Sequence, residues 1–497
     1  MSRTAVLKVL GVAAVALLAL KLLFMPSPKA PYPHIIFIVA DDLGWNDVSW
    51  HNPQVKTPNL EKYARAGVIL NSSYVAPVCS PSRASFMTGY YAHRTGLQHI
   101  PIIHFKEMYL PSRFTLLPEL LKQKGYATHL VGKWHLGFCN WRYTPRYRGF
   151  DSFLGYYGGQ EGYYNHSNGK VEEGYDLRDN EEVLPDPDME YGMYILNRGM
   201  EKVIAEHDKT QPLFLFLSYQ SVHSPLEAPQ RFVDLHPEVK NPNRKTFNGM
   251  ISVLDEAFGN ATAALQREGL LDNALIIFTS DNGGSPDVGG NNWPLRGGKF
   301  SLWEGGTRVP AFVYSKNLLS KTGYTNNEFI HAVDWFPTML NVAGIKPTDD
   351  HLDGISQWET LKVGRPSFRK EFIYNIDEVD QNGAIRVGDF KLIKGEPGRF
   401  FDWFPVPSGD EVAPTQYPTW KRRPWTPKMF PDYQLFNISA DPEERHNLAD
   451  DFPEVVQQLK QKLTSYERLV VPSQHPPVEP KSLPHNFGGV WTPGWCD

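Results

Sequence analysis

Four short runs of apolar residues lie along the first part of the chain. Their length and continuous hydrophobic character are typical of strands buried on both faces, as in parallel sheets. The runs are His34–Ala40, Ala127–Val131, Pro212–Tyr219 and Ala274–Ser280. Helical periodicity falls between them, over Leu116–Lys124 and Phe247–Glu268, and a glycine follows each helical segment. The alternation predicts an open α/β sheet with helices on its faces.

Polar side chains follow each predicted strand at its carboxyl end. They are Asp41 and Asp42, Lys133 and His135, His223, and Asp281 and Asn282. In open α/β sheets ligands bind at this edge, where the loops after different strands meet. We therefore expect these residues, which are far apart in sequence, to converge on one site.

After about residue 365 the pattern changes to short alternating segments separated by turns. The segments are Glu371–Asn375, Ala384–Val387, Phe390–Lys394 and Tyr433–Ile438. They predict a small antiparallel sheet, on which a helix over Glu454–Leu469 packs. The Pro- and Trp-rich stretch Phe401–Asp432 is expected to form a long ordered loop. The predicted domains are residues 34–365 and residues 366–497.

The first two dozen residues have a different character. Arg3 and Lys8 precede an apolar run from Val9 to Leu20, which is typical of a targeting segment. A cleaved signal peptide and an uncleaved membrane anchor over residues 5–25 both fit, with a linker reaching residue 33. Four Asn-x-Ser/Thr sequons, at Asn71, Asn165, Asn260 and Asn437, would accept glycans and favour the secretory pathway.

The composition excludes some classes of protein. With 497 residues and 41% hydrophobic content the chain can bury a large core. Its net charge of -5 indicates no broad basic surface, so nucleic acid is not an expected partner. Three cysteines, Cys79, Cys139 and Cys496, are too few for a disulfide scaffold. If Cys79 is used in chemistry, Cys139 and Cys496 remain to pair.

The sequence Cys-Ser-Pro-Ser-Arg at residues 79–83 predicts the start of a helix. Ser80 would be its N-cap and Pro81 its first helical residue. The free amides of a helix N-terminus attract anions, and Arg83 adds a positive charge close by. Taken alone, however, a single cysteine such as Cys79 is more often a buried residue before an ordinary helix.

Two motifs give this segment a second interpretation. Residues 79–89 carry Cys-x-Pro-Ser-Arg followed by Thr-Gly, and residues 125–135 carry Gly-Tyr-Ala-Thr followed by Gly-Lys-Trp-His. Both resemble the signatures of the sulfatases, and the first resembles the substrate of the formylglycine-generating enzyme. The resemblance runs from about His34 through the C-terminal domain. It is closest to the arylsulfatase B group, the N-acetylgalactosamine-4-sulfatases. Further matching stretches are residues 40–48, 221–223, 281–284, 291–297 and 301–306.

The resemblance implies an alkaline-phosphatase-like sulfatase fold, with a large, mixed, mostly parallel sheet flanked by helices and a small C-terminal domain carrying an antiparallel sheet. It implies a lysosomal or extracellular hydrolase that cuts sulfate esters with a formylglycine made from Cys79 and one calcium ion. The implied metal ligands are Asp41, Asp42, the modified Cys79, Asp281 and Asn282. Three carboxylates and an amide also favour a hard cation on chemical grounds. Taken singly, these carboxylates would be solvated turn residues.

The resemblance also implies the roles of the remaining site residues. A hydroxyl of the hydrated formylglycine attacks sulfur, and Arg83 and Lys133 stabilise its negative charge while calcium polarises the sulfate. His223, Lys299 and Lys133 bind the sulfate, with the first two also contacting the leaving oxygen. His135 then takes a proton from the second hydroxyl. Without the motifs, both histidines would be interpreted as structural.

By the same resemblance, the substrate is an aryl sulfate or a sulfated N-acetylgalactosamine end of a glycosaminoglycan. Candidate aromatic platforms for the sugar are Trp293, Trp303, Tyr163 and Tyr164. The small number of cysteines departs from the better-known members of the group. We therefore expect the segments Ile100–Ser112 and Gly155–Asp179 to differ from those enzymes in conformation.

Two other functions are compatible with part of this pattern. A phosphatase or phosphodiesterase of the wider fold would place Ser or Thr, with two zinc ions, where this chain has Cys79. A glycan-binding protein without activity would not need the catalytic positions, and here each of them is filled.

Overall fold

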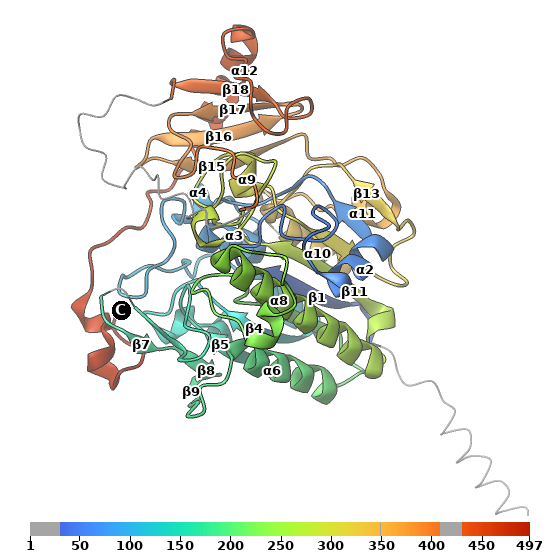
Figure 1. The fold of residues 1–497 in the computed structure, drawn as a ribbon, viewed down its shortest axis with the longest axis vertical. Coiled ribbons are helices and arrows are strands. Elements are labelled where there is room, and N and C mark those ends of the chain that lie inside the picture. The colour runs from blue at the N-terminus through green and yellow to red at the C-terminus, as the bar shows by residue number, and fades with distance from the viewer. Residues whose placement is uncertain (1–29, 170, 348, 408–429) are drawn as a thin grey trace, which may run out of the picture.

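The computed structural model describes residues 30–169, 171–347, 349–407 and 430–497. A ten-stranded sheet runs through the larger part of the molecule (Figure 1). Its order is β13 (Tyr324–Asn326), β2 (Val68–Leu70), β12 (Phe312–Tyr314), β11 (Ala274–Ser280), β1 (His34–Ala40), β10 (Leu213–Ser218), β4 (Ala127–Lys133), β5 (Ser152–Tyr156), β8 (Leu177–Asp179) and β9 (Glu182–Val183). This confirms the predicted α/β sheet and its four central strands.

The centre of the sheet is parallel. Strands β11, β1, β10, β4 and β5 pair with their neighbours in parallel. The pairs β11–β12, β12–β2, β5–β8 and β8–β9 are antiparallel. The sheet is therefore mixed and mostly parallel, as predicted. Strand β4 extends two residues beyond its predicted end at Val131, and β10 is one residue shorter at each end than predicted.

Successive side chains of β1 point to opposite faces of the sheet, and each face packs into its own hydrophobic core. Ile35, Phe37 and Val39 pack with α3 (Cys79–Thr88), α5 (Leu117–Gln123) and α10 (Trp335–Val342). Ile36 and Ile38 pack on the opposite face with α2 (Pro58–Ala66), α6 (Gly192–Glu206) and α8 (Pro242–Arg267). Because helices cover both faces, the central strands are apolar throughout.

The two predicted helices are confirmed as α5 and α8. The latter begins at Pro242, five residues before its predicted start, because Asn241 caps it by accepting a hydrogen bond from the amide of Arg244. Gly125 and Gly269 follow the two helices with φ angles of 84° and 73°. Glycine adopts this left-handed conformation without steric strain, so these positions end the helices as predicted.

A second, four-stranded antiparallel sheet forms the smaller part of the molecule. Its strands are β15 (Glu371–Asp377), β16 (Asn382–Val387), β17 (Phe390–Lys394) and β18 (Tyr433–Asn437). Helix α12 (Pro453–Glu467) packs on it through Leu459 and Leu463. The predicted small sheet and its helix are confirmed, whereas the boundary at residue 365 stays a prediction.

Short elements connect these units. They are β3 (Ser73–Tyr74), α4 (Ala92–Thr95), β6 (Ser167–Asn168), β7 (Gly174–Tyr175), α7 (Gln230–Val233), α9 (Glu304–Thr307), β14 (Ile330–His331) and α11 (Trp358–Val363). The predicted targeting segment and residues 408–429 of the predicted loop Phe401–Asp432 lie outside the described residues. In the described part of the chain, no helix combines the length and the apolar character needed to cross a membrane.

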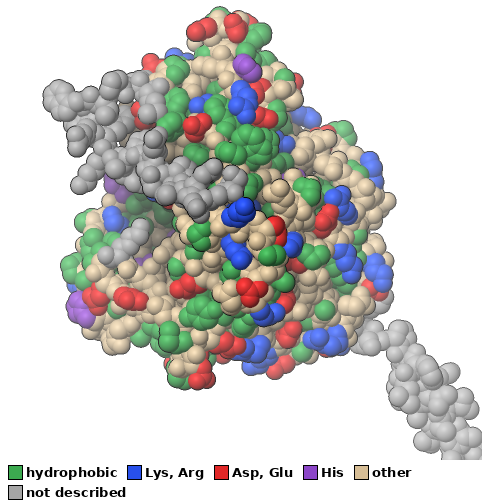
Figure 2. Space-filling view, viewed as in Figure 1, with side chains coloured by type: hydrophobic (Ala, Val, Ile, Leu, Met, Phe, Trp, Pro, Cys, Tyr) green, Lys and Arg blue, Asp and Glu red, His purple; other side chains and the backbone are tan. Residues whose placement is uncertain are grey.

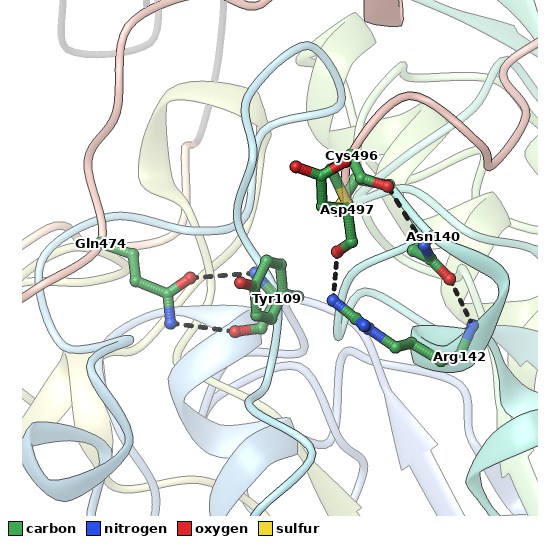
Figure 3. The surroundings of a disulfide bond; sticks show 7 residues. Tyr109, Asn140, Arg142, Gln474, Cys496 and Asp497 are labelled. Atoms are coloured by element: carbon green, nitrogen blue, oxygen red, sulfur yellow. Dashed lines mark hydrogen bonds between the residues drawn. A yellow bond between two sulfur atoms is a disulfide. The ribbon is translucent and has the colours of Figure 1, made fainter.

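After α12 the chain runs back along the larger part of the molecule as a segment, residues 471–497, which contains two short 3-10 helices, Pro480–Ser482 and Pro484–Phe487, and which we call the strap (Figure 1). Its end is fixed by a disulfide between Cys139 and Cys496, whose Cα atoms are 5.4 Å apart. The structure therefore shows that these two cysteines pair, which the sequence left open. Around the disulfide, Asn140 donates a hydrogen bond to the carbonyl of Cys496, and Arg142 donates one to the carbonyl of Asp497 (Figure 3).

Candidate active site

The carboxyl ends of β1, β4, β10 and β11 lie side by side, because β1 pairs with both β10 and β11 and β10 pairs with β4. Asp41 and Asp42 follow β1 directly, and Asp281 and Asn282 follow β11. Lys133 is the last residue of β4. The structure thus brings the predicted polar residues to one edge of the sheet.

Two lysines pair with the aspartates that follow β1. Lys133 Nζ lies 2.7 Å from Asp41 Oδ2, and Lys299 Nζ lies 2.7 Å from Asp42 Oδ1. All four side chains are buried. Burial and the nearby Asp281 raise the pKa of Asp41 to about 7. Burial also acts to raise the pKa of Asp42, but Lys299, His223 and the hydrogen bond from Asn282 together hold it below its ordinary value. Asp41 is therefore the carboxylate of this pair whose negative charge is less fully compensated.

Arg83 reaches across the site from the first half of α3. It donates to Asp281 Oδ2 from Nε at 2.9 Å, and its Nη2 lies 2.8 Å from the same oxygen as an ion-pair contact. Burial alone would raise the pKa of Asp281, but Arg83 and Lys133 lower it below the ordinary value. Arg83 Nη1 also donates to the hydroxyl of Ser218, which in turn donates to the carbonyl of Lys133 at 2.7 Å. This hydrogen-bond network ties α3, β4, β10 and β11 together.

The start of α3 differs from the prediction. The helix begins at Cys79, and Val78 is the residue that precedes it, so the assignment of Ser80 as N-cap was wrong. The Ser80 hydroxyl instead accepts a hydrogen bond from the amide of Ile102 at 3.0 Å. Pro81 is the third helical residue and not the first, which is tolerated because amides of the first turn have no intrahelical partner. A tertiary contact has therefore replaced the predicted cap.

Cys79 opens α3 among these charged groups. The structure holds it as unmodified cysteine, so its Sγ marks the place of the oxygen atoms that a formylglycine would carry. This Sγ lies 3.6 Å from Asp41 Oδ1. Burial raises the pKa of the thiol to about 12, although Lys133 and Lys299 oppose that effect. The thiol is therefore protonated near neutral pH and is a poor nucleophile as it stands.

The residues present fit a hard cation. Asp41, Asp42, Cys79 and His223 each place one potential ligand atom within 4.8 Å of the others. Asn282 Nδ2 donates to Asp42 Oδ1 at 2.8 Å, while Asn282 Oδ1 is buried and has no hydrogen-bond partner among the described residues. A buried amide oxygen without a partner is unfavourable unless a ligand satisfies it. Oxygen ligands of this kind suit calcium.

His135 is oriented by its backbone contacts. Its Nε2 lies 2.9 Å from the carbonyl oxygen of Ile102, which only accepts, so Nε2 carries the hydrogen. Its Nδ1 is therefore the basic nitrogen, and it is buried without a hydrogen-bond partner in the described chain. Burial, Lys133 and Arg83 hold the pKa of His135 well below its ordinary value. The neutral ring thus presents an available proton acceptor.

His223 lies on the other side of Asp42. Its Nδ1 donates to the carbonyl of Ser224 at 2.7 Å, which leaves Nε2 directed toward Asp42 Oδ2 at 3.7 Å. Burial and Lys299 lower the pKa of His223 to about 3. For Lys299 itself, burial acts to lower the pKa, but Asp42 raises it above the ordinary value. Lys299 is therefore a permanent cation beside a neutral imidazole.

The four aromatic candidates for sugar binding separate by exposure. Tyr163 and Trp303 are fully buried. Tyr163 donates its hydroxyl to the carbonyl of His223, and the Trp303 ring lies under the guanidinium of Arg296 at 3.8 Å. They are packed parts of the structure, so their assignment as platforms was wrong. Trp293 is 37% exposed and remains open to a ligand, and Tyr164 is partly exposed.

Sequence reasoning missed the residues that hold the site together. Ser218 carries no signal in the sequence beyond being the last residue of an apolar strand. Ile102 acts through its carbonyl and amide groups, which any residue could supply. Gly158 packs against His104, and Gly159 packs against His135. Only their adjacency in the sequence indicated a close approach of the backbone.

Comparison with known proteins finds one family, and two relatives and one solved structure are among the proteins that resemble this chain. Residues 33–345 match the family described as Sulfatase. Arylsulfatase J of Mus musculus is 42% identical over 485 residues, which cover 93% of this chain and 80% of the relative. N-acetylgalactosamine-6-sulfatase of Mus musculus is 28% identical over 494 residues, which cover 92% of this chain and 91% of the relative. Among solved structures, Ps i-CgsB in complex with k-i-k-neocarrahexaose superposes with a TM-score of 0.76 at 28% identity, covering 89% of this chain and 94% of that chain.

Proposed function

Because this chain belongs to the sulfatase family, we propose that it hydrolyses sulfate esters with a formylglycine made from Cys79 and one calcium ion. The predicted family and its enzymatic class, a sulfatase hydrolase, are confirmed by these relatives. The modification, the metal and the roles of the individual residues are the proposed part. The narrower resemblance to the arylsulfatase B group also stays a prediction.

One observation carries the proposal: Cys79 stands among three lysine and arginine side chains and three carboxylates, yet its own thiol is held in the protonated form. An unmodified cysteine in this place has no evident use as a nucleophile or as a structural residue. Formylglycine at position 79 would supply a hydrated aldehyde, whose hydroxyl is a nucleophile that needs cationic neighbours. Arg83 and Lys133 are the cations placed to stabilise it.

Calcium would be held by Asp41, Asp42, Asp281 and Asn282 together with the side chain at position 79, and would polarise the sulfate oxygens. The unsatisfied Asn282 Oδ1 and the raised pKa of Asp41 support this assignment, because a cation relieves both. The chain's own residues would do the rest. Lys299, Lys133 and His223 would bind and orient the sulfate ester.

One of the two histidines would transfer a proton, and the other would contact the leaving oxygen. His135 presents an unprotonated Nδ1, so it would accept a proton from the group at position 79. His223 Nε2 carries no hydrogen and would face the leaving oxygen without donating to it, while the ammonium group of Lys299 would supply the proton that this oxygen takes up. Because both rings are neutral, neither repels the cations that bind the sulfate.

For the substrate we propose a sulfated carbohydrate, with an N-acetylgalactosamine-containing glycosaminoglycan as the first choice. One relative is named as an N-acetylgalactosamine-6-sulfatase and one solved neighbour contains a carrageenan-type oligosaccharide, as its name indicates. The exposed Trp293 supports a sugar ligand, since an aromatic ring can pack against the apolar face of a sugar. Release of sulfate from 4-sulfated and 6-sulfated N-acetylgalactosamine would identify the position.

We also propose the secretory pathway as the route, ending in the lysosome or outside the cell. The Cys139–Cys496 disulfide supports this, because such bonds persist in oxidising compartments. The four sequon asparagines are all at least partly exposed, as glycan acceptors must be. In that pathway the formylglycine-generating enzyme would be the partner that modifies Cys79.

The test compares a chromogenic aryl sulfate with the matching aryl phosphate, using protein from a secretory host and a Cys79→Ala control. Formylglycine at position 79 is measured by mass spectrometry in the same samples. We expect sulfate release that depends on the modification and is lost in the control. A phosphate rate above the sulfate rate would favour a phosphatase. No release from fully modified protein, with normal sugar binding, would favour a glycan-binding protein without activity.

A further inference from the structure

We infer that Trp491 positions the two chain segments that pack against His135 at the active site. The strap and its disulfide hold Trp491 in place. The inference rests on the proposed function, because His135 has its role there. Trp491 belongs to the last seven residues of the chain and is fully buried.

Two segments, residues 100–112 and 155–179, lie against each other next to His135. We call them the wall of the active site. Gly159 lies so close to the imidazole that a Cβ added to it would be 2.6 Å from His135 Nε2. A Cβ on Gly158 would be 1.6 Å from Nε2 of His104, which comes from the other segment. The peptide of these two glycines is therefore sandwiched between two imidazole rings. Any shift of this peptide moves His135 with it.

Segment 100–112 also contacts His135 directly. The carbonyl of Ile102 accepts the hydrogen bond from His135 Nε2, and the amide of the same residue donates to Ser80, next to Cys79. The position of this segment therefore fixes which nitrogen of His135 is basic. It also fixes the distance between that ring and the start of α3.

Trp491 is the contact common to both segments. Its ring packs on His104 at a centroid distance of 5.1 Å. Its Nε1 donates to the carbonyl of Asn168 at 2.7 Å, and its amide donates to the carbonyl of Tyr175 at 2.9 Å. The carbonyl of Trp491 accepts from Arg178. The indole thus joins His104 of the first segment to Asn168 of the second, and the backbone of Trp491 adds Tyr175 and Arg178.

The strap brings Trp491 to this place and fixes it on both sides. Before Trp491, Gln474 exchanges two hydrogen bonds with the backbone of Tyr109, at 3.0 and 2.9 Å (Figure 3). The amide of Glu479 donates to the carbonyl of Phe105. After Trp491, the disulfide closes the strap on Cys139, which is only four residues beyond His135. The strap therefore clamps the two segments against the strand end that carries the histidine.

The energetic consequence follows from packing. Replacing a fully buried tryptophan by alanine leaves a cavity between the two segments, and they relax into it. A displacement of about 1 Å at a catalytic group lowers a rate by up to about 100-fold. Lys299 and His223 come from other loops, and Lys133 is held at the end of β4 by its ion pair with Asp41, so binding of the sulfate is expected to change little. Loss of Trp491 should therefore lower kcat with KM nearly unchanged.

The experiment uses the full-length enzyme with its formylglycine content measured, and compares Trp491→Ala, Trp491→Phe and Trp495→Phe. Trp495 is the matched control, since it lies on the same strap, its ring packs on Phe138, and its Nε1 has no hydrogen-bond partner among the described residues. We expect kcat for an aryl sulfate to fall about 10-fold or more in Trp491→Ala, with KM within about twofold. Trp491→Phe should keep much of the activity, and Trp495→Phe all of it.

A double-mutant cycle separates positioning from general stability. Gly159→Ala pushes directly on His135, so its effect on kcat and that of Trp491→Ala should be non-additive if both act on the same ring. If Trp491→Ala does not fold, the same cycle is run with the Cys139→Ser/Cys496→Ser variant, which releases the strap at its end. Additive effects, or unchanged kcat in folded Trp491 variants of an active enzyme, would overturn the inference. An inactive wild-type enzyme would instead overturn the proposed function.

Discussion

Lys299 Nζ lies 2.7 Å from Asp42 Oδ1 and 2.9 Å from Oδ2, so a residue from a loop beyond β11 neutralises the carboxylate that follows β1. The same cation is, after burial, the largest cause of the low pKa of His223. One lysine therefore sets the charge of two neighbours, making the aspartate an anion and keeping the imidazole neutral. Figure 2 shows lysine and arginine side chains scattered over the visible surface, and Lys299 differs from such residues in being buried.

Lys299→Met keeps the length of the side chain and removes its charge. We expect kcat/KM for an aryl sulfate to fall by about 100-fold or more, since a buried cation that binds the reacting anion is lost. The pKa of His223 should rise in the variant, because its second largest lowering influence is gone. NMR of labelled histidine measures that shift. Lys316→Met is the control, since Lys316 pairs with Asp272 on the surface, and an equal loss of activity there would contradict the assignment.

The pH dependence of kcat follows from the two histidines. Burial lowers the pKa of His135 well below its ordinary value and that of His223 to about 3, so neither ring gains a proton in the pH range in which a free histidine titrates. A bound cation would lower these values further. A base with a lowered pKa loses function only when the pH falls below that lowered value. We therefore expect kcat to stay within about twofold between pH 5 and 7. An inflection of kcat near pH 6.5 that disappears in His135→Gln would show that His135 titrates in this range and would contradict the prediction.

Arg83→Ala removes one partner of a buried ion pair and leaves Asp281 as an uncompensated charge. The expected loss is about 3–5 kcal/mol in the free energy of unfolding. Arg83→Lys should lose less stability, because it keeps the charge and loses only the hydrogen bond from Nε and the second guanidinium contact with Asp281 Oδ2. Urea titrations measure both. Arg65→Ala is the comparison, since the exposed Arg65–Glu61 pair should contribute less than about 1 kcal/mol. Equal losses at the two arginines would argue against the buried pair.

Calcium removal should separate activity from stability. In the absence of the ion each of the three carboxylates still has a cation bonded to it, so the site does not carry three unopposed charges. We expect a chelator to abolish sulfate release and to lower Tm by only a few degrees. At 100 times Kd, calcium contributes about 2.7 kcal/mol. Differential scanning calorimetry checks this, and Asn282→Ala should show a smaller calcium-dependent shift. Full activity after chelation would contradict the metal assignment.

Protein made without the modifying enzyme should contain an unreactive thiol. Cys139 and Cys496 are bonded to each other, which leaves Cys79 as the free thiol. It is 2% exposed, and burial raises its pKa to about 12, so iodoacetamide should label the native protein very slowly at pH 8. Protein unfolded in urea serves as the control and should react fully. Rapid labelling of the native protein would show that the pocket around Cys79 is open.

The four central strands and the residues after them could be predicted because burial on both faces leaves a continuous apolar signal. The apolar runs end at or just before the polar residues Asp41, Lys133 and Asp281. Lys299 is different, since it lies in a loop and only its resemblance to a family motif indicated a role. Its contact with Asp42 depends on the path of that loop, which no local pattern determines.

The errors have a common physical origin in tertiary contacts. Serine is a common N-cap residue, but the hydroxyl of Ser80 instead accepts a hydrogen bond from the amide of Ile102. Tyr163 and Trp303 are aromatic residues of the kind that bind sugars, but each is fully buried in the structure. Propensity describes what a residue can do locally, and long-range packing decides among those options. Ile102 itself acts through its backbone, so no side-chain pattern could have identified it.

The disulfide that closes the strap joins residues 357 positions apart, and this separation has a consequence for the order of synthesis. At roughly 5–20 residues per second, the ribosome adds Cys496 about 20–70 s after Cys139. During that interval the strands that carry Asp41 and Lys133 already exist, but the strap that completes the wall does not. The segments that pack next to His135 therefore gain their last contacts only after Cys496 has been synthesised, which leaves a limited time for an enzyme that modifies Cys79 before the fold is complete.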